Sequence, residues 1–441
     1  MPKVSLITLG CAKNLVDSEV MLAKLHLRGY KFTADLNQAD ILVINTCGFI
    51  QPAREEAHRT IEEGIAWKTR RPGRLLVVVG CYPERFLDYL EVKYPQVDVW
   101  SGVGAFDRID EMIEKKKSIY GGETFLLDHR TPRVVTTGQN WAYLKISEGC
   151  SHRCTFCSIP LIKGPYKSRE IDSVVAEVRN LVSLGIKEIN LVSHDTTYFG
   201  RDRKKTGELP ALLEKLLQIR GLEWIRILYG YPEEVDDRLL ELLCEPKICR
   251  YLDLPFQHAS AAVLKKMGRG LDGRRALKLL EKIRKKVPGV AVRTSLIVGF
   301  PAEGEKEFKE LMQFVAQARF EHLGVFCYSQ EIGTASSSYP DVVPEKEKRR
   351  RQRLIMQQQR KISREFYRSF VGQKLEVLIE GPHPENPDYL IGRTRFQAPE
   401  VDGKVLIEYP RRARKKTLPA FLQVSITGAL DYDLIGRVKD D

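Results

Sequence analysis

The strongest constraint on this chain is a group of three cysteines in the segment EGCSHRCTFC. Cys150, Cys154 and Cys157 are separated by three and then by two residues. Three thiolates on one short loop can bind three irons of a 4Fe–4S cube, which leaves the fourth iron free to hold a small molecule by its amino and carboxylate groups. A structural zinc ion is the alternative, but zinc usually takes four ligands, and only His152 is near enough in sequence to be the fourth. The spacing therefore favours a cluster.

Length and cysteine content narrow the class of protein. At 441 residues the chain exceeds one ordinary core, and about three domains are expected. The sequence has no run of eighteen apolar residues and begins with a strand pattern rather than a signal peptide, so we expect no membrane span and a cytoplasmic location. Nine cysteines are an odd number in a long chain, which favours reduced, metal-binding thiols over disulfides.

The net charge of +13 is unevenly distributed. Residues 345–370 hold ten Lys/Arg and three Asp/Glu, which is 10 − 3 = +7, whereas residues 371–441 hold eleven of each. About half of the excess therefore lies on one segment. This pattern predicts a local contact with an acidic partner such as nucleic acid, rather than a uniformly basic binding protein.

The first 130 residues repeat one pattern three times. Apolar runs at 4–9, 41–45 and 75–79 lead into Cys11, Cys47 and Cys81, with helical patterns between them. Such runs predict parallel strands with crossover helices, and ligands of open α/β sheets bind at the carboxyl ends of the strands. One such cysteine could be an ordinary buried side chain. Three at the same topological position favour a shared ligand.

The middle of the chain follows a linker at 128–140 and alternates strand and helix patterns. We expect strands at 142–146, 188–193, 224–228, 251–254, 292–298 and 322–327. Six βα units are too few for a complete eight-stranded barrel, so an open, partial barrel is predicted. The cysteine loop would then follow the first of its strands.

The last hundred residues predict two further elements. Residues 345–370 read as one basic helix with an apolar stripe that contains Ile355, Ile362, Phe366 and Phe370. Short alternating runs then predict a small antiparallel barrel of the OB-like kind, with strands at 374–380, 390–394, 404–409 and 421–427. The basic run at 411–416 would be an inter-strand loop, either a solvated tip or a nucleic-acid contact.

The motifs resemble those of a known family over essentially the whole chain. The cysteine loop resembles the signature of the radical S-adenosylmethionine (SAM) enzymes. Together with LGCAKNLVDSE at 9–19, NTCGFI at 45–50 and GC at 80–81, it resembles the radical SAM methylthiotransferases. Three further motifs resemble those of the branch that modifies ribosomal protein S-twelve: SHDTTYFG at 193–200, APEVDG at 398–403 and YDL at 432–434. At the place of the first motif, the tRNA-modifying branch has a sequence that resembles Gly-Gln-Asn-Val. PAEGE at 301–305 departs slightly from the family pattern.

This resemblance implies an α/β protein of three domains. An N-terminal methylthiotransferase domain with an open parallel sheet would cover residues 1–130, and a partial (βα)6 radical SAM barrel would cover 137–344. A basic connecting helix would follow at 345–370, and a TRAM domain, a small OB-like antiparallel barrel, at 371–441.

The resemblance also implies the chemistry. Cys11, Cys47 and Cys81 would bind an auxiliary 4Fe–4S cluster, in addition to the cluster on Cys150, Cys154 and Cys157. SAM would be both the methyl donor and the radical source, and a methylthio group would be added to the β-carbon of an aspartate in ribosomal protein S-twelve. Because the cofactors carry the difficult step, no catalytic side chain is expected beyond the cluster ligands.

Four further residues are expected to contact SAM. The resemblance places Phe156 near the adenine, where simple packing is its alternative role. Glu188 would receive the amino group, unless it is an inert residue at the start of a strand. Arg293 would pair with the carboxylate or form a surface ion pair, and Gly299 would border the adenine. Gln257 and His258 are weaker candidates, and Cys244, Cys249 and Cys327 are expected to be structural.

The expected partners are ribosomal protein S-twelve or the small ribosomal subunit, an electron donor such as flavodoxin or ferredoxin, and RNA through the TRAM domain. That domain, whose acidic residues include Glu400, Asp402, Asp431 and Asp433, would face the basic ribosomal protein with complementary charge. Two alternatives remain at this point: a tRNA adenosine methylthiotransferase, and a non-enzymatic RNA- or ribosome-binding protein with structural metal.

Overall fold

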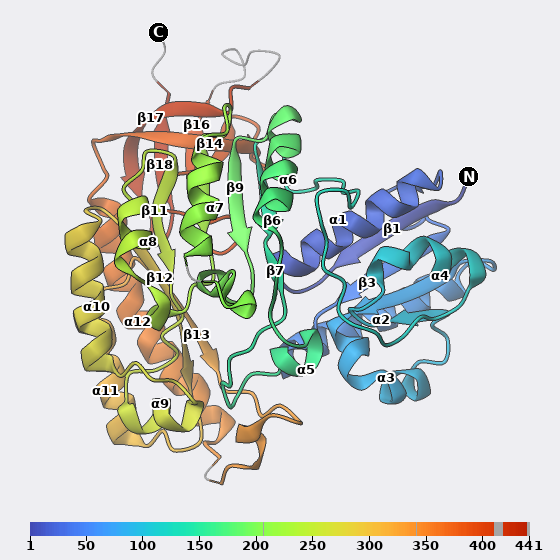
Figure 1. The fold of residues 1–441 in the computed structure, drawn as a ribbon, viewed down its shortest axis with the longest axis horizontal. Helices are drawn as coiled ribbons and strands as arrows, with labels where there is room; N and C mark the ends of the chain where they lie inside the picture. Colours follow the sequence, from blue (N-terminus) through green and yellow to red (C-terminus); the bar gives the residue numbers. More distant parts are fainter. Residues whose placement is uncertain (206, 341, 410–417, 439–441) are drawn as a thin grey trace.

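The structure is a computed structural model that describes residues 1–205, 207–340, 342–409 and 418–438. Three sheets define three units, and Figure 1 shows the N-terminal one in blue beside the central sheet and the C-terminal barrel in red above it. The expected α/β fold class, with two parallel sheets and a small barrel, is confirmed. Throughout the described ranges, helices that combine the length and apolar character needed to span a membrane are absent.

The N-terminal unit is a parallel five-stranded sheet in the order β2-β1-β3-β4-β5. Every residue of two of its three inner strands, β3 and β4, is buried, because apolar clusters cover both faces of the sheet. The two edge strands escape prediction because runs of two and three residues carry no periodic signal. The elements are β1 Lys3–Thr8, α1 Ala12–Leu27, β2 Lys31–Phe32, β3 Ile41–Thr46, α2 Gln51–Thr69, β4 Leu75–Gly80, α3 Cys81–Lys93, β5 Val99–Ser101 and α4 Ile109–Lys115.

The central unit is a six-stranded parallel sheet in the order β13-β12-β11-β10-β9-β6, and all six expected strands are present. Its strands are β6 Trp141–Lys145, β9 Glu188–Val192, β10 Trp224–Ile227, β11 Ile248–Asp253, β12 Ala291–Val298 and β13 His322–Cys327. A two-stranded ribbon, β7 Ser147–Glu148 with β8 Lys167–Ser168, follows the first strand. The helices are α5 Ile159–Lys163, α6 Ile171–Ser183, α7 Glu208–Leu217, α8 Asp237–Leu242, α9 Ala261–Met267, α10 Gly273–Lys286 and α11 Glu305–Ala318.

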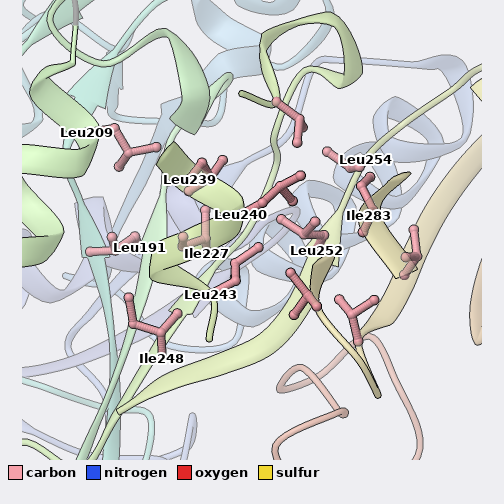
Figure 2. Close-up of a cluster of buried hydrophobic side chains, with 14 of the residues drawn as sticks. Leu191, Leu209, Ile227, Leu239, Leu240, Leu243, Ile248, Leu252, Leu254 and Ile283 are labelled. Carbon is pink, nitrogen blue, oxygen red and sulfur yellow. The ribbon is translucent and has the colours of Figure 1, made fainter. Parts of the chain in front are cut away.

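Along each strand of the central sheet, side chains alternate between the outer face, which the helices cover, and the interior of the partial barrel. Figure 2 shows Leu191, Ile227 and Leu252 of three neighbouring strands packed beneath Leu239 and Leu240 of α8. All five side chains are at most 2% exposed. Burying one aliphatic side chain of this size stabilises the fold by about 1.5–3 kcal/mol. Burial therefore keeps these apolar residues on the outer face of the sheet, and the alternate residues of each strand are left to line the interior.

The long helix α12, Glu345–Arg368, connects the sheet to the C-terminal barrel. Ile355 and Ile362 are buried on its predicted apolar stripe. The barrel closes in the order β14-β15-β16-β18-β17, with strands β14 Lys374–Pro382, β15 Tyr389–Arg393, β16 Val405–Glu408, β17 Phe421–Ala429 and β18 Leu434–Arg437. The sequence predicted four of these strands and missed the short β18, whose parallel pairing with β16 closes the barrel. The basic run at 411–416 lies outside the described residues.

The C-terminal barrel closes the amino-terminal end of the partial barrel. Glu188, the first residue of β9, is fully buried between Arg226 of β10 and Arg393 of β15, with oxygen–nitrogen distances of 2.9 and 2.6 Å. Tyr143 donates a hydrogen bond of 2.8 Å to Glu400, and Tyr251 donates one of 2.6 Å to Asp402. The open end of the barrel is therefore the end where the strands finish and the cysteine loop begins.

Four acidic residues of the C-terminal barrel have partners within the chain. Glu400 and Asp402 bind the tyrosines of the central barrel. Asp431 pairs with Arg360 and Arg364 of α12, and Asp433 accepts the backbone N–H of Lys404 at 2.7 Å. Each of these four carboxylates has a partner within the chain, and the expectation that the acidic barrel faces a ribosomal protein stays a prediction.

We predict that Glu188→Gln destabilises the protein substantially. The change leaves Arg226 buried without a carboxylate and leaves Arg393 with Glu380 alone. Removal of one partner from a buried pair typically costs about 3–5 kcal/mol. Thermal unfolding should show a clearly lower melting temperature, with earlier proteolysis between α12 and β14. Arg360→Ala is the control, because its pair with Asp431 is on the surface and should contribute little. Equal melting temperatures for both variants would contradict this account.

Candidate functional site

The first cysteine loop leaves the carboxyl end of the central sheet, directly after β7. Its entry depends on Gly149, which has φ +73°; a Cβ there would lie 2.1 Å from the carbonyl oxygen of Pro165. Cys150 donates its backbone N–H to Gly164, and Cys157 donates to Cys154 in a tight turn, both at 3.1 Å. The loop thus brings three thiols together by backbone geometry.

Cationic and aromatic side chains lie beside this loop. The guanidinium of Arg269 lies 3.8 Å from the ring centre of Tyr231 and 3.9 Å from the sulfur of Cys154. His152 stacks on Tyr231 with ring centres 4.0 Å apart, and its Nε2 is 2.5 Å from Asp195. Positive charge near thiolates stabilises their charged form, which metal ligation requires.

The second set of cysteines lies at the carboxyl ends of three strands of the N-terminal sheet. Cys11 precedes α1, Cys47 follows β3, and Cys81 begins α3 after β4. A Cβ on Gly10 would lie 2.8 Å from the Cβ of Cys47, and one on Gly48 would lie 2.6 Å from the carbonyl oxygen of Cys81. Glycines therefore allow the three loops to approach one another closely.

Burial keeps most of these thiols protonated until a metal binds. It raises the pKa of Cys47 and Cys150 to about 11, and that of Cys81 and Cys157 to about 12. Metal binding must therefore displace protons. Within the described ranges, no three Cys, His, Asp or Glu side chains are grouped so as to hold one metal ion.

The two cysteine loops touch each other. The hydroxyl of Ser158, the residue after Cys157, donates a hydrogen bond of 3.1 Å to the carbonyl of Phe49, two residues after Cys47. Ile162 of α5 packs against Cys81 in one apolar cluster. Both sets of thiols therefore border the same open end of the partial barrel.

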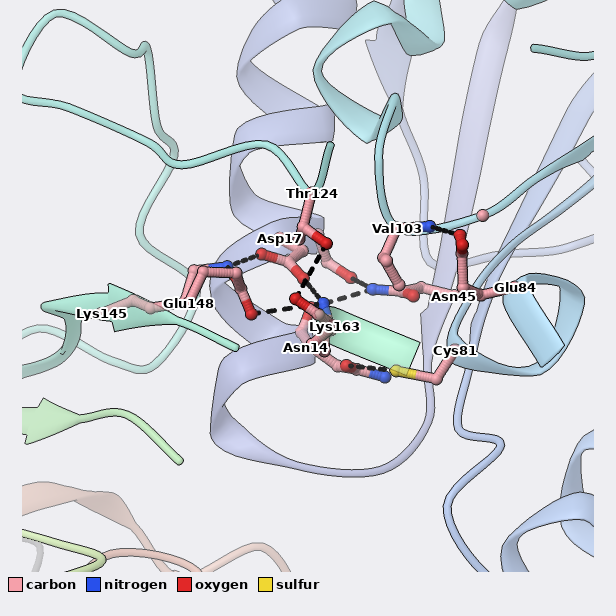
Figure 3. A network of polar contacts seen from close by, with 12 residues as sticks. Asn14, Asp17, Asn45, Cys81, Glu84, Val103, Thr124, Lys145, Glu148 and Lys163 are labelled. Atoms are coloured by element: carbon pink, nitrogen blue, oxygen red, sulfur yellow. Dashed lines mark hydrogen bonds and ion pairs between the residues drawn. The ribbon is translucent and has the colours of Figure 1, made fainter. Parts of the chain in front are cut away.

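A buried network of charges joins the two units beneath these loops, as Figure 3 shows. Lys145 pairs with Asp17 of α1 and with Glu148, the latter at 2.5 Å. Lys163 binds the same two carboxylates at 3.2 and 3.6 Å. Burial lowers the pKa of Lys163, but Asp17 and Glu148 outweigh that effect and hold it well above its ordinary value. No local sequence pattern marks this network, although Asp17 and Glu148 belong to the two cysteine motifs.

A second contact holds the N-terminal unit against the central one. Glu331, which follows β13, is 2.9 Å from Arg85 and also pairs with Arg54. Arg85 in turn donates a hydrogen bond of 2.7 Å to the carbonyl of Gly48, next to Cys47. The loop after the last barrel strand is therefore tied directly to an auxiliary cysteine loop.

The expected SAM contacts divide into two groups. Phe156 packs against an apolar cluster that contains Phe300, the residue after Gly299, which follows β12. Gly299 has φ +75°, and a Cβ there would lie 2.2 Å from Lys348 of α12. Arg293 lies deeper in the barrel, with its nitrogens 3.2 Å from Asp253 and 3.4 Å from Asp402. The contacts of Phe156 and Gly299 with SAM stay predictions, whereas Arg293 already has two carboxylates of its own.

The position of Glu188 differs from the expectation that this residue receives the amino group of SAM. It lies at the amino end of β9, buried against Arg226 and Arg393, whereas the cysteine loop is at the carboxyl end of the sheet. It therefore holds two domains together and is not placed to receive the amino group of SAM. His258 is also structural, because it is fully buried and its Nδ1 accepts the backbone N–H of Ser260 at 3.0 Å. Gln257 contributes backbone hydrogen bonds to β12.

Three segments of the chain match described families. Residues 3–102 match Uncharacterized protein family UPF0004, residues 144–315 match the Radical SAM superfamily, and residues 371–438 match the TRAM domain. Among solved structures, the radical SAM methyltransferase TsrM from Kitasatospora setae, with tryptophan and aza-SAM bound, has a TM-score of 0.55 and 14% identity. The likeness covers 74% of this chain and 73% of TsrM, and at this identity it concerns the fold alone.

Curated relatives match nearly the whole chain. The ribosomal protein uS12 methylthiotransferase RimO of Pelobacter propionicus is 43% identical over 445 residues, which cover 99% of this chain and 98% of the relative. The protein of the same name from Geotalea uraniireducens is 43% identical over 443 residues, with the same two coverages. These matches confirm the resemblance found in the sequence: the chain belongs to the RimO family of radical SAM methylthiotransferases.

Proposed function

We propose that this enzyme adds a methylthio group to the β-carbon of an aspartate in ribosomal protein uS12, the S-twelve of the sequence analysis. The observation that carries the proposal is the contact between the two cysteine loops at one end of the barrel, through Ser158 and Phe49. Two sets of three thiols suit two 4Fe–4S clusters, each with one iron free of protein ligands. The near full-length relatives, named for uS12, support the choice of substrate.

The proposed ligands are Cys150, Cys154 and Cys157 for one cluster and Cys11, Cys47 and Cys81 for the other. When bound, the clusters and SAM supply the electron, the radical, the sulfur and the methyl group. The chain's own residues position these groups and exclude water. Phe156 and Gly299 would border the adenine, and Arg293 would be reached by the SAM carboxylate only in competition with Asp253 and Asp402.

The remaining parts of the proposal concern organisation and partners. We divide the chain into residues 1–130, 137–344, 345–370 and 371–441, with the auxiliary cluster in the first and SAM in the second. The enzyme would act in the cytoplasm, on free uS12 or on the small ribosomal subunit, with flavodoxin or ferredoxin as electron donor. The match to the TRAM domain supports an additional contact with RNA.

The substrate prediction is tested with the full-length, reconstituted enzyme. Incubation with uS12, SAM and a reductant should add one methylthio group to one aspartate, and tandem mass spectrometry should locate it on the β-carbon. tRNA incubated in parallel should yield no methylthio-adenosine. Modified tRNA with no mass change on uS12 would overturn the proposal in favour of a tRNA methylthiotransferase.

The two sets of cysteines should have separable roles, because they belong to different units. Cys157→Ala should abolish reductive SAM cleavage, measured as 5′-deoxyadenosine. Cys47→Ala should retain measurable cleavage but transfer no methylthio group. Iron and sulfide analysis of each variant is the control, with about half of the wild-type content expected in both. Loss of cleavage in a folded Cys47→Ala protein that keeps its first cluster would refute this division.

The close approach of Gly149 to Pro165 predicts a backbone test of the first cysteine loop. Gly149→Ala should lower the iron content by about half, because the new methyl group would collide with a carbonyl oxygen that cannot move freely. Gly164→Ala is the matched control: its φ is +68°, but a Cβ there has no atom within 4 Å. The control should lose some stability and keep its iron. Full iron content in Gly149→Ala would show that the loop tolerates the change.

A further inference from the structure

One buried lysine at the open end of the barrel forms no direct ion pair with a carboxylate among the described residues. Lys13 is 6% exposed, and its ammonium contacts only the carbonyl of Ser193 at 3.3 Å and the ring of Tyr229, whose centre is 3.8 Å away. In the part of the chain that the structure describes, no carboxylate oxygen lies within 4.0 Å of this nitrogen. Lys145 and Lys163, by contrast, each contact two carboxylates.

An unpaired ammonium is costly inside a protein. A carbonyl oxygen and an aromatic face replace only part of its hydration, so an arriving anion would gain a charge-assisted hydrogen bond there. Tyr229, beneath the ammonium, has φ +60°, an unfavourable backbone conformation for a bulky residue. Strained residues persist where the surrounding structure requires them, which is often at a ligand site. Lys13 and Tyr229 thus form a preformed place for an anion.

The place is close to both cysteine loops. Lys13 lies two residues after Cys11, in the first turn of α1, where the positive end of the helix dipole also favours an anion. Its ammonium reaches across to Ser193 and Tyr229, which follow the carboxyl ends of β9 and β10. His194, beside Ser193, has a buried Nε2 with no hydrogen-bond partner among the described residues. The site therefore lies where the two units meet, below the auxiliary cysteines.

We propose that Lys13 receives the side-chain carboxylate of the substrate aspartate and so determines that an acidic residue is modified. This inference rests on the proposed function. In an aspartate the carboxylate is bonded directly to the β-carbon, so a cation that holds the carboxylate also holds that carbon within one bond length of a known position. An asparagine or a nucleobase in the same place would leave the ammonium without its anion, which disfavours both.

The carboxylate of SAM is the competing ligand. Arg269 lies 3.9 Å from the sulfur of Cys154, beside the loop that would hold SAM, and belongs to the central unit. Lys13 belongs to the N-terminal unit and starts from an auxiliary cysteine. Lys13 therefore lies across the interface from the central-unit arginines, which favours Arg269 or Arg293 for SAM and Lys13 for the substrate.

The test compares Lys13→Met, Lys13→Arg and Lys24→Met in the reconstituted full-length enzyme. Lys24→Met is the matched control, because Lys24 lies on the same helix beyond the interface. The substrates are a uS12 peptide with its target aspartate and the same peptide with asparagine there. For Lys13→Met, KM for the aspartate peptide should rise by about tenfold or more, as expected for loss of a charge-assisted hydrogen bond. Its cluster content and SAM affinity should stay at wild-type values. Lys13→Arg should recover part of the lost peptide affinity.

A merely structural lysine would not change the preference between the two peptides. The wild type should bind the aspartate peptide about tenfold more tightly than the asparagine peptide, and Lys13→Met should bind both equally. Unchanged KM and preference in Lys13→Met would overturn the inference while leaving the proposed function intact, whereas a wild type that modifies neither peptide nor uS12 would overturn the function itself.

Weaker SAM binding in Lys13→Met without peptide would assign the lysine to SAM. If Lys13→Met lost its clusters, equal binding of the two peptides by the wild type would decide against the inference.

Discussion

Four buried charges hold the catalytic end of this protein together. Lys145 and Lys163 of the central unit bind Asp17 of the N-terminal helix α1 and Glu148 of the cysteine loop. Replacing all four charged residues by apolar ones need not lower the stability of the fold. Removing one charge alone would leave its buried partners without a counter-ion, which is strongly destabilising. Such a network tolerates one relative position of the two units far better than any other. It therefore fixes how the two sets of thiols face each other, which apolar contacts between the units would leave less defined.

The C-terminal barrel has a complementary role at the other end. It covers the amino ends of the barrel strands with Arg393, Glu400 and Asp402, each bonded to a residue that lines the interior. An open six-stranded sheet would otherwise expose its interior at both ends. With the amino end closed, the carboxyl end, where both sets of cysteines lie, is the end left for the proposed substrate and SAM. A TRAM domain in this protein is thus part of the active-site enclosure as well as an expected RNA contact.

Much of the fold could be predicted from the sequence, because parallel buried strands form apolar runs bounded by turn residues. The same logic placed the cysteines at strand ends. The edge strands β2 and β5 and the barrel strand β18 were missed because two to four residues carry no clear period. The role of Glu188 could not be predicted, since its partner Arg393 is 205 residues away and no local pattern marks a buried ion pair. The lysine network was missed for the same reason: its members come from four separate elements.

That long separation between Glu188 and Arg393 bears on biosynthesis. Chains are made from the N-terminus at about 5–20 residues per second, so roughly 10–40 s pass between the synthesis of Glu188 and that of its partner. During that interval Glu188 and Arg226 line an unsealed interior, and water must solvate the charges that the finished protein buries. The central unit can reach its final packing only after the last domain leaves the ribosome. A prematurely terminated chain would therefore remain open and vulnerable to proteases, which limits the accumulation of truncated proteins able to bind SAM.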